Sequence, residues 1–579
     1  MKASELIKKY INFFKSKNHK EIQNASLIPE HDPTVLFTTA GMHPLIPFLL
    51  GQEHPQGKRL VNVQKCIRTN DIELVGDSTH LSFMEMLGNW SLGDYWKEDA
   101  IKYSHEFLTK VLKINQKDLY ITLFKGDKNS KKDLESEKIW LSLSIPKNHI
   151  YFLSKKDNWW GPIGKTGPCG PDTEIFIDTG IKKCSKTCKP GCNCGKYFEI
   201  WNNVFMQYNK TKSKKLIELK QKNIDTGMGV ERTTAILQGK KSVYDTELFM
   251  PIIDHIKKHT QKPNEKSIRI IADHIKAAVF ILAEGIIPSN LDQGYILRRF
   301  IRRSIRHQKI LEINKPIIQD IAKIIINIYK KRYPSLVQKQ PFIIKELKKE
   351  EQKFSKTLEK GLNKFRSFIK NKKKLSGKEA FLLYQSFGFP IEITQELASE
   401  KNIKINLKEF EKEFKNHQKI SRKGAEKKFK GGLIDASHET TKLHTASHLL
   451  LYAIRKILKN PNIMQKGSNI TPERLRLDFN FDRKLTNKEL ESIENLVNKL
   501  IKQKIKVTKK QVTLEEAKKL GAISPFEYKT NKVFIYIIGP SIEICMGPHV
   551  KNTSELGKFK IIKEESSSAG IRRIKAVLE

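Results

Sequence analysis

Two short patterns of metal-binding residues lie far apart in the C-terminal part of the chain. His444-Thr-Ala-Ser-His448 places two imidazoles one helical turn apart on the same face. Cys545-Met-Gly-Pro-His549 offers a thiolate and a third imidazole in a segment predicted as a strand followed by a turn. Four nitrogen and sulfur ligands suit a tetrahedral zinc ion. A chain that joins both patterns in one site must fold them into the same domain, which is the strongest single constraint on its architecture.

The length and charge of the chain limit its class. With 579 residues it has room for about three or four domains. The net charge of +44 favours a polyanionic partner, and nucleic acid is the first candidate. The alternative is a general preference for Lys, Ile and Asn, which the sequence shows throughout.

The cysteine content and the N-terminal segment point to the cytoplasm. Seven cysteines in a chain of this length do not resemble a disulfide framework. The first residues begin an amphipathic helix without the apolar core of a signal peptide. No apolar run is long enough to cross a bilayer. We therefore predict a cytoplasmic protein with reduced thiols and no membrane partner.

Composition and periodicity divide the chain into three predicted domains. Residues 1–240 mix short helices, strand-like runs and turn glycines, as an α+β domain does. Residues 241–425 carry apolar residues at helical spacing. A basic and then glycine-rich break at Lys428–Gly432 accompanies the start of a third domain, residues 426–579, which contains both metal patterns. The fold class is predicted to be α+β and multidomain.

A cysteine-rich insertion, residues 182–196, interrupts the first domain. Its thiols stand close enough in sequence to surround one tetrahedral zinc ion, and they belong to Cys184, Cys188, Cys192 and Cys194. The loop is too polar to be held by an apolar core, so a metal is a reasonable source of its order. Free thiols or two disulfides are the alternatives. We expect a structural zinc without a catalytic role.

Two arginines of the first domain stand near glycine turns. Arg68 begins a polar loop, and Arg232 follows the glycine-rich stretch Asp225–Gly229. A guanidinium group can form two parallel hydrogen bonds to a phosphate, and glycines let backbone amides approach the phosphate closely. Taken singly, each arginine is more often a surface or structural residue.

A strongly basic helix is predicted in the second domain. Between Gly294 and His307 the apolar residues fall on one side, and arginine is used in a chain that otherwise prefers lysine. We expect this helix to present a ridge to RNA phosphates, formed by Arg298, Arg299, Arg302, Arg303 and Arg306. The alternative is an ordinary solvated face.

The order of the motifs resembles that of the alanyl-tRNA synthetase family. The matching segments run along nearly the whole chain and are Thr38–Met42, Cys66–Arg68, Phe83–Asn89, Thr166–Pro171, Ile200–Asn202, Asp225–Gly229, Ala272–Ile275, Gly294–Arg299, Gly431–Leu433, His444–His448, Gln465–Ser468 and Cys545–His549. The resemblance implies a class II synthetase catalytic domain built on an antiparallel sheet, an all-α domain that recognises tRNA, and an α/β editing domain that contains zinc.

The resemblance also implies a reaction and its residues. Alanine attacks the α-phosphate of ATP, which is bound with Mg²⁺, and the alanyl group then passes to the 3′ end of alanine tRNA. Arg68 would stabilise the α-phosphate, and Arg232 would cover the adenine or the terminal phosphates, as the two catalytic arginines. The family's nucleotide and alanine pocket corresponds to Arg68, Trp160, Ile200, Trp201, Asn202, Asp225, Gly229 and Arg232. Asn202 would hydrogen-bond the substrate, Asp225 would pair with its α-ammonium group, and Gly229 would allow close backbone contact.

Further expectations concern tRNA recognition and editing. Asn290 matches the asparagine that reads a G·U pair in the acceptor stem, whereas Gln385 stands at the position of the family's aspartate, so we expect altered G·U discrimination. The zinc of the editing domain, which hydrolyses tRNA mischarged with serine or glycine, would be held by His444, His448, Cys545 and His549. Gln465 matches a residue of the same pocket.

Some positions depart from the family pattern. Leu81 stands where many members have a histidine, and Asp172 replaces a cysteine. Met546 and Pro548 differ from the residues that the family has around the thiolate ligand. Pro548 replaces a threonine, and the loss of the threonine hydroxyl is expected to loosen the editing site. The sequence ends where the editing domain ends in the family, so a monomer without the further C-terminal domain is expected.

Two other functions are weighed against this one. A free-standing editing hydrolase with an inert N-terminal half is disfavoured because Arg68, Asn202, Asp225 and Arg232 are all present. An RNA-binding protein without enzymatic activity would bind tRNA but form no adenylate.

Overall fold

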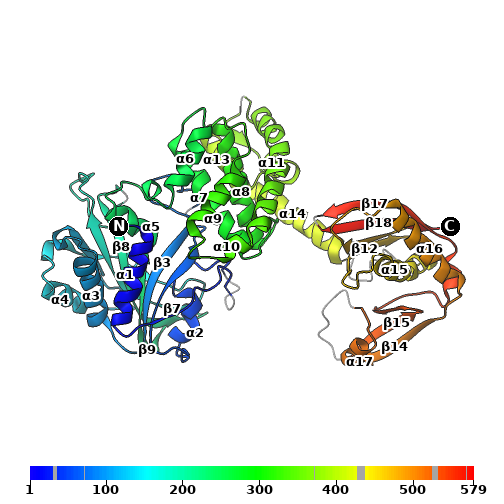
Figure 1. Ribbon diagram of the computed structural model, residues 1–579, viewed down its shortest axis with the longest axis horizontal. Helices are drawn as coiled ribbons and strands as arrows, with labels where there is room; N and C mark the ends of the chain where they lie inside the picture. The colour runs from blue at the N-terminus through cyan, green and yellow to red at the C-terminus, as the bar shows by residue number, and fades with distance from the viewer. Residues whose placement is uncertain are drawn as a thin grey trace. The chain divides into compact units, whose positions relative to one another are not determined.

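The chain divides into two units in a computed structural model (Figure 1). The structure describes residues 1–29, 35–70, 72–192, 194–370, 372–426, 437–523, 532–568 and 570–579. The first unit contains residues 1–375 and 379–405, and the second contains residues 376–378 and 406–579. The second unit thus begins earlier than the predicted boundary at residue 426. The break Lys428–Gly432 lies outside the described residues.

The first unit is built on a nine-stranded sheet in the order β1-β2-β3-β9-β8-β7-β4-β5, with β6 paired to β7. The strands are β1 (Lys20–Glu21), β2 (Arg59–Ile67), β3 (Phe83–Leu92), β4 (Leu119–Phe124), β5 (Ile150–Leu153), β6 (Trp159–Trp160), β7 (Gly167–Asp178), β8 (Tyr197–Lys210) and β9 (Leu216–Gly229). The pairs from β2 through to β4 are antiparallel, whereas β1–β2 and β4–β5 are parallel. The sheet is therefore mixed, with an antiparallel centre.

Helices pack on the sheet because their apolar faces match it. In α1 (Ala3–Ser16), the side chains of Leu6, Tyr10 and Phe14 recur at helical spacing and are fully buried. Tyr10 also donates a hydrogen bond of 2.8 Å to Asn89 of β3, which fixes the helix to the sheet. The other helices of this part are α2 (Ile46–Leu49), α3 (Lys97–Glu106), α4 (Leu134–Ser142) and α5 (Val230–Leu237).

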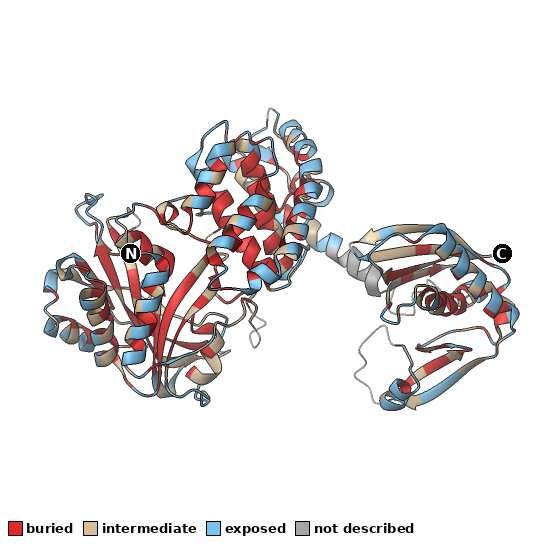
Figure 2. Cartoon of the chain, viewed as in Figure 1, coloured by how far each residue is buried: buried red, intermediate tan, exposed pale blue. Residues whose placement is uncertain are grey.

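The rest of the first unit is helical apart from the short parallel pair β10 (Lys374–Leu375) and β11 (Lys404–Ile405). Its helices are α6 (Met250–His259), α7 (Glu265–Ala283), α8 (Asp292–Ile310), α9 (Ile318–Tyr329), α10 (Ser335–Gln338), α11 (Gln340–Ile369), α12 (Gly377–Phe387) and α13 (Ile391–Glu400). Helix α7 is buried along most of its length, and α8 packs against it (Figure 2). The sheet and the helices share one compact unit, so residue 240 does not separate compact units.

The expected exposed basic ridge on α8 is wrong. The side chains of four of its five predicted arginines are only 3–8% exposed, namely Arg299, Arg302, Arg303 and Arg306. Carboxylates from distant segments pair with them, as in the 2.7 Å bond from Arg302 Nε to Glu350 and the 2.6 Å bond from Arg306 Nη2 to Glu400. Because a buried guanidinium needs a partner, these arginines pair with carboxylates of the protein, some buried and some exposed, and do not form a solvent-facing ridge.

The second unit places helices against two antiparallel sheets, β12-β13-β18-β17 and β14-β15-β16. Its elements are α14 (Leu407–Glu426), α15 (His438–Ile457), β12 (Gln465–Thr471), β13 (Arg474–Asn480), α16 (Asn487–Lys502), β14 (Val507–Thr513), α17 (Leu514–Lys519), β15 (Lys532–Ile538), β16 (Ser541–Ile544), β17 (Phe559–Ser568) and β18 (Ile571–Leu578). Leu449, Leu450 and Ile454 of α15 are fully buried in the main core, beside Leu475 and Leu477 of β13. This core holds α15 rigidly, so its histidines have fixed positions.

The helices can also be compared with the dimensions of a bilayer. Among the described residues, no helix combines the length and apolar character that crossing a membrane requires.

Candidate functional sites in the two units

A cavity of about 330 Å³ opens on one face of the central sheet of the first unit. Alternation along the strands determines its lining, because every second side chain of a strand points to the same face. On β8 these are Ile200, Asn202 and Val204, joined by Glu199 where the register of the β7–β8 pair shifts, and on β9 they include Asp225. The remaining predicted pocket residues that line it are Arg68, Trp160, Gly229 and Arg232.

Trp201 does not line the cavity, so its predicted role there is wrong. It lies between Ile200 and Asn202 and therefore points to the opposite face of the sheet. There its ring is 5.6 Å from that of Tyr10 and 6.3 Å from that of Phe14, both in α1, measured between centroids. Trp201 is 1% exposed and belongs to the core beneath the pocket.

Both predicted catalytic arginines are held on the wall of the cavity. Arg68 follows β2 and donates from Nε to the carbonyl of Thr39 at 3.2 Å, and its guanidinium lies 5.6 Å from the centre of a Trp160 ring. Arg232, in the first turn of α5, donates from Nη1 to Glu199 Oε2 at 3.0 Å. Two guanidinium groups on one cavity suit a ligand that carries several phosphates.

Asp225 provides a buried negative charge in the same cavity. Its side chain accepts a 2.7 Å hydrogen bond from Trp90 Nε1, and the residue is 5% exposed. Burial raises the pKa of Asp225 to about 7. Among the described residues no cation pairs with it, so a cationic group of a ligand would relieve the unfavourable burial of this carboxylate.

A second group of polar residues fixes the amide of Asn202. Its Nδ2 donates to Asp172 at 3.3 Å and to Glu174 at 3.4 Å, both on β7. Asn158 Nδ2 donates to the other oxygen of Asp172 at 3.0 Å. Asn202 Oδ1 is buried and has no hydrogen-bond partner among the described residues, so it can accept from a ligand.

Sequence reasoning misses this group, although a signal is present. Asp172 stands out in the sequence only as a departure from the family pattern, and Glu174 and Asn158 do not stand out at all. The spacing of Asp172 and Glu174 by two residues on a strand does indicate a shared face. Burial raises the pKa of Asp172 to about 7 and that of Glu174 well above its usual range.

The second unit brings the four predicted metal ligands together. His444 and His448 are on α15, and Cys545 and His549 follow β16. Their ligand atoms all lie within 4.8 Å of one another, and Cys545 Sγ is 3.5 Å from Nε2 of both His444 and His549. A tetrahedral zinc ion with Zn–S near 2.3 Å and Zn–N near 2.0 Å separates sulfur and nitrogen ligands by about 3.5 Å. The donor set therefore fits zinc.

Outer contacts orient the imidazoles of this cluster. Nδ1 of His444 lies 2.9 Å from the carbonyl oxygen of Pro548, and Nδ1 of His549 lies 3.2 Å from the hydroxyl of Thr445. These contacts put the ring proton on Nδ1 and leave Nε2 available for a metal. Burial lowers the pKa of His444 to about 4, so the ring is neutral at pH 7. Pro548 lacks the threonine hydroxyl of the family, but its backbone carbonyl supplies an outer contact.

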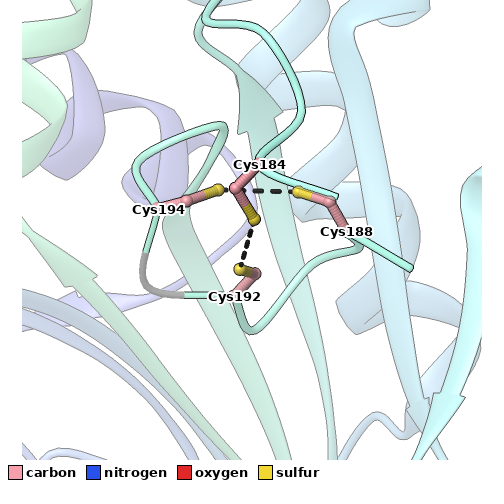
Figure 3. A group of neighbouring side chains, drawn as sticks. All are labelled: Cys184, Cys188, Cys192 and Cys194. Atoms are coloured by element: carbon pink, nitrogen blue, oxygen red, sulfur yellow. Dashed lines mark hydrogen bonds between the residues drawn. The ribbon is translucent and has the colours of Figure 1, made fainter. Parts of the chain in front are cut away.

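The four cysteines of the insertion also converge (Figure 3). Cys184 Sγ is 3.5 Å from Cys192 Sγ, and Cys188 Sγ is 3.5 Å from Cys194 Sγ. All four are free thiols. Sulfurs about 2.3 Å from a common zinc ion stand about 3.8 Å apart, so the observed spacing is close to that of a zinc site with four thiolate ligands. The cluster packs against Phe176 and Tyr197, which belong to β7 and β8.

The other predicted site residues occupy separate places. Asn290 is exposed before α8 and accepts a hydrogen bond from Arg298, whose side chain is 12% exposed. Gln385 is exposed on α12. Gln465 begins β12 in the second unit and donates to Ser468 Oγ at 3.2 Å. The tRNA-binding and editing roles expected for these residues remain predictions.

Sequence similarity to known proteins extends along the whole chain. The family described as "tRNA synthetases class II (A)" matches residues 5–477, and "Threonyl and Alanyl tRNA synthetase second additional domain" matches residues 533–575. The alanine–tRNA ligase of Borrelia hermsii is 53% identical over 100% of both chains, and that of Borreliella afzelii is 55% identical over 100% of both. The alanine–tRNA ligase of Petrotoga mobilis is 36% identical over 99% of this chain and 79% of its own length. The chain therefore belongs to the alanine–tRNA ligase family of class II aminoacyl-tRNA synthetases.

Proposed function

We propose that the first unit activates alanine with ATP and transfers it to the 3′ end of alanine tRNA, and that the second unit hydrolyses mischarged tRNA. The observation that carries the first part is one cavity with two fixed arginines and a buried carboxylate that lacks a cation among the described residues. Arginines attract phosphates, and the carboxylate attracts an ammonium group. A single ligand pair, ATP and an amino acid, satisfies both.

The arginines serve the nucleotide. Arg68 stabilises the negative charge that gathers on the α-phosphate when the alanine carboxylate attacks it, and pyrophosphate leaves. Arg232 contacts the adenine or the terminal phosphates from the first turn of α5. Mg²⁺ bound with ATP would supply further positive charge to the phosphates. The work of the protein is positioning and charge stabilisation rather than formation of a covalent enzyme intermediate.

Asp225 and Asn202 serve the amino acid. The ionised carboxylate of Asp225 pairs with the α-ammonium group of alanine. The buried Oδ1 of Asn202 accepts a hydrogen bond from the same ammonium group or from an adjacent group of the substrate. Asp172 and Glu174 hold the amide so that the oxygen, rather than the nitrogen, is presented. This arrangement recognises the α-ammonium end that all amino acids share. Selection for alanine therefore depends on the size of the pocket.

Pocket size alone does not reject every competitor. Glycine fits a pocket made for alanine, and serine adds one hydroxyl, so binding discriminates by roughly 10–200-fold. A second site that hydrolyses wrong products restores accuracy. In this chain His444, His448, Cys545 and His549 would hold zinc, which would orient the ester end of the tRNA, while Gln465 contributes to the pocket. The match of residues 533–575 to the second additional domain supports this assignment.

The cysteine insertion has a structural role in this proposal. Zinc held by its four thiols would keep the polar loop between β7 and β8 ordered. No step of the reaction is assigned to it.

Recognition of tRNA is assigned to the helical part of the first unit. Asn290 and Gln385 are exposed, as residues that read an acceptor stem must be. Because Gln385 lacks a negative charge, we propose altered discrimination of the G·U pair. The buried arginines of α8 are not part of this surface.

Charging and editing assays on matched variants test the two-site proposal. Wild type is expected to charge alanine tRNA and to deacylate Ser-tRNA. Arg68→Ala should lose charging but keep deacylation, and His448→Ala should do the reverse. Both variants can be checked for an unchanged fold by circular dichroism. A wild-type protein that charges no tRNA with alanine would overturn the first part, and equal deacylation by wild type and His448→Ala would overturn the second.

A further inference from the structure

Residues 72–82 form a segment that lies between β2 and β3 and makes one wall of the nucleotide cavity. Thr79, His80 and Leu81 line the cavity beside Arg68 and Arg232. The segment has no regular secondary structure, so its shape must come from contacts with other elements.

Helix α8 holds the first part of this segment. Arg303 donates from Nη1 to the carbonyl oxygen of Ile72 at 3.0 Å, and Arg299 pairs with Glu73. Arg303 is 6% exposed and its other nitrogens form a two-pronged pair with Glu396 of α13. A planar guanidinium with both a carboxylate and a backbone carbonyl as partners has little freedom to move.

Helix α7 holds the last part of the segment. Asp273 Oδ1 accepts a 2.8 Å hydrogen bond from the backbone nitrogen of Ser82. Its Oδ2 lies 2.8 Å from Nδ1 of His274, and Nε2 of His274 lies 2.8 Å from Nη1 of Arg303. With the proton on Nδ1, the imidazole donates to Asp273 and accepts from Arg303.

These contacts form one continuous chain from Ser82 through Asp273, His274 and Arg303 to Ile72. Asp273 and His274 are fully buried. The two ends of the segment are therefore held by the same pair of helices, at a spacing that the helix packing determines.

A third element holds the middle of the segment. The hydroxyl of Tyr244 donates to the carbonyl oxygen of His80 at 3.0 Å, and Ser242 Oγ donates to that of Ser78 at 3.0 Å. These bonds act on the backbone beside the residues that line the cavity. They hold the segment in addition to the helices, and they offer a second place at which the support of the segment can be tested.

We propose that Arg303, with the Asp273–His274 pair, is a positioning residue for the nucleotide wall. Helix α8, whose sequence pattern suggests an RNA-binding ridge, shapes the ATP site from behind. The inference rests on the proposed activation of alanine by ATP. Misplacement of a binding wall by about 1 Å can reduce activity by about a hundredfold, so the loss of this support is measurable.

Arg303→Met and Arg306→Met form a matched pair of variants. Both arginines are buried on α8 and pair with carboxylates of α13, but Arg306 forms its ion pairs with Glu396 and Glu400 rather than with the segment. In ATP–pyrophosphate exchange, which needs no tRNA, Arg303→Met should raise the KM for ATP by at least about tenfold and leave the KM for alanine within about twofold. Arg306→Met should change neither KM by more than about twofold. Equal effects of the two variants on the KM for ATP would overturn the inference.

A second pair of variants, with smaller changes, tests the inference if Arg303→Met does not fold. Tyr244→Phe removes the hydroxyl that holds His80, whereas Tyr329→Phe removes a buried hydroxyl that has no hydrogen-bond partner among the described residues. Tyr244→Phe should raise the KM for ATP by about fivefold, in keeping with one lost hydrogen bond, and Tyr329→Phe should not. An unchanged KM for ATP in Tyr244→Phe would count against the inference.

Hydrogen exchange separates this inference from the proposed function. Arg303→Met should speed amide exchange within residues 72–82 relative to Arg306→Met, whether or not ATP is the ligand. Absence of pyrophosphate exchange in the wild-type protein would contradict the proposed function alone. Unchanged amide exchange in Arg303→Met would contradict the positioning role alone.

Discussion

Replacing Asp225 by asparagine separates the charge of this residue from its shape. Asp225 lines the cavity but is largely buried, and burial raises its pKa to about 7. The α-ammonium group of alanine binds the ionised carboxylate, so protonation competes with alanine. The carboxylate is about nine-tenths ionised at pH 8 and about one-tenth ionised at pH 6, and the KM for alanine should therefore rise about tenfold as the pH falls between these values.

The Asp225→Asn variant cannot ionise at this position, so its profile should be flat. At pH 8 the variant also lacks the attraction between charges, and a hydrogen bond to a charged group contributes about 1.5–3 kcal/mol, which corresponds to alanine binding weaker by about 10–150-fold. Pyrophosphate exchange at saturating ATP, measured from pH 6 to pH 8, gives both numbers. A wild-type KM for alanine that does not change with pH would contradict the pairing of alanine with an ionised Asp225. A slope that survives in Asp225→Asn would assign the titration to Asp172, whose pKa is also about 7.

The same substitution, Asp225→Asn, should weaken alanine binding but stabilise the folded protein. The pKa of Asp225 is about 7 in the folded protein and 3.8 in an unperturbed chain, so the unfolded state releases the proton first as pH rises. Folding is then disfavoured by up to about 4 kcal/mol above pH 7, and the penalty disappears below about pH 4. An unmatched amide N–H of the introduced asparagine offsets about 1–3 kcal/mol of the gain. Asp225→Asn should therefore raise the melting temperature of the first unit at pH 8, and a lower melting temperature there would contradict the assigned pKa.

Other predictions concern the metal clusters and the RNA. Cys545→Ala should leave alanine charging unchanged and let Ser-tRNA accumulate, which gel separation of charged tRNA would show; equal deacylation by wild type and variant would contradict the editing site. Cys188→Ser should reduce bound zinc from about two ions to about one per chain by mass spectrometry, and unchanged zinc would rule out the site formed by the four cysteines of the insertion. Acceptor-stem transcripts with G·U or G·C should be charged at more similar rates by wild type than by Gln385→Asp, and strict G·U dependence of the wild type would refute altered discrimination.

The metal clusters are predictable from the sequence because their ligands occur in short patterns of histidine and cysteine. Histidines four residues apart on a helix share a face whatever surrounds the helix, and four cysteines in one loop can meet without help from other segments. All eight candidate ligands can therefore be identified before the fold is known. The outer contact from the Pro548 carbonyl cannot, because every residue carries a backbone carbonyl and no side-chain pattern marks this one as the partner of His444.

The errors arise where the answer depends on distant partners. The motif around Trp201 suggests a pocket residue because a motif does not show which side chains of a strand point to which face of the sheet. The neighbouring Ile200 and Asn202 are the residues that face the cavity. The arginines of α8 have helical spacing that suits a phosphate ridge, but Glu350 and Glu400, which neutralise two of them, lie far along the chain. A charged residue in the sequence does not show whether its side chain faces solvent or pairs with a carboxylate of a distant segment.

Alanine-dependent ATP–pyrophosphate exchange by the purified chain, with Arg68→Ala as the paired variant, is the most direct test of whether this cavity activates alanine. Exchange should require alanine and ATP together and should fall at least about a hundredfold when the charge-stabilising Arg68 side chain is removed. No exchange by the wild-type protein, or the same rate in Arg68→Ala, would contradict the assignment of this cavity to the activation of alanine.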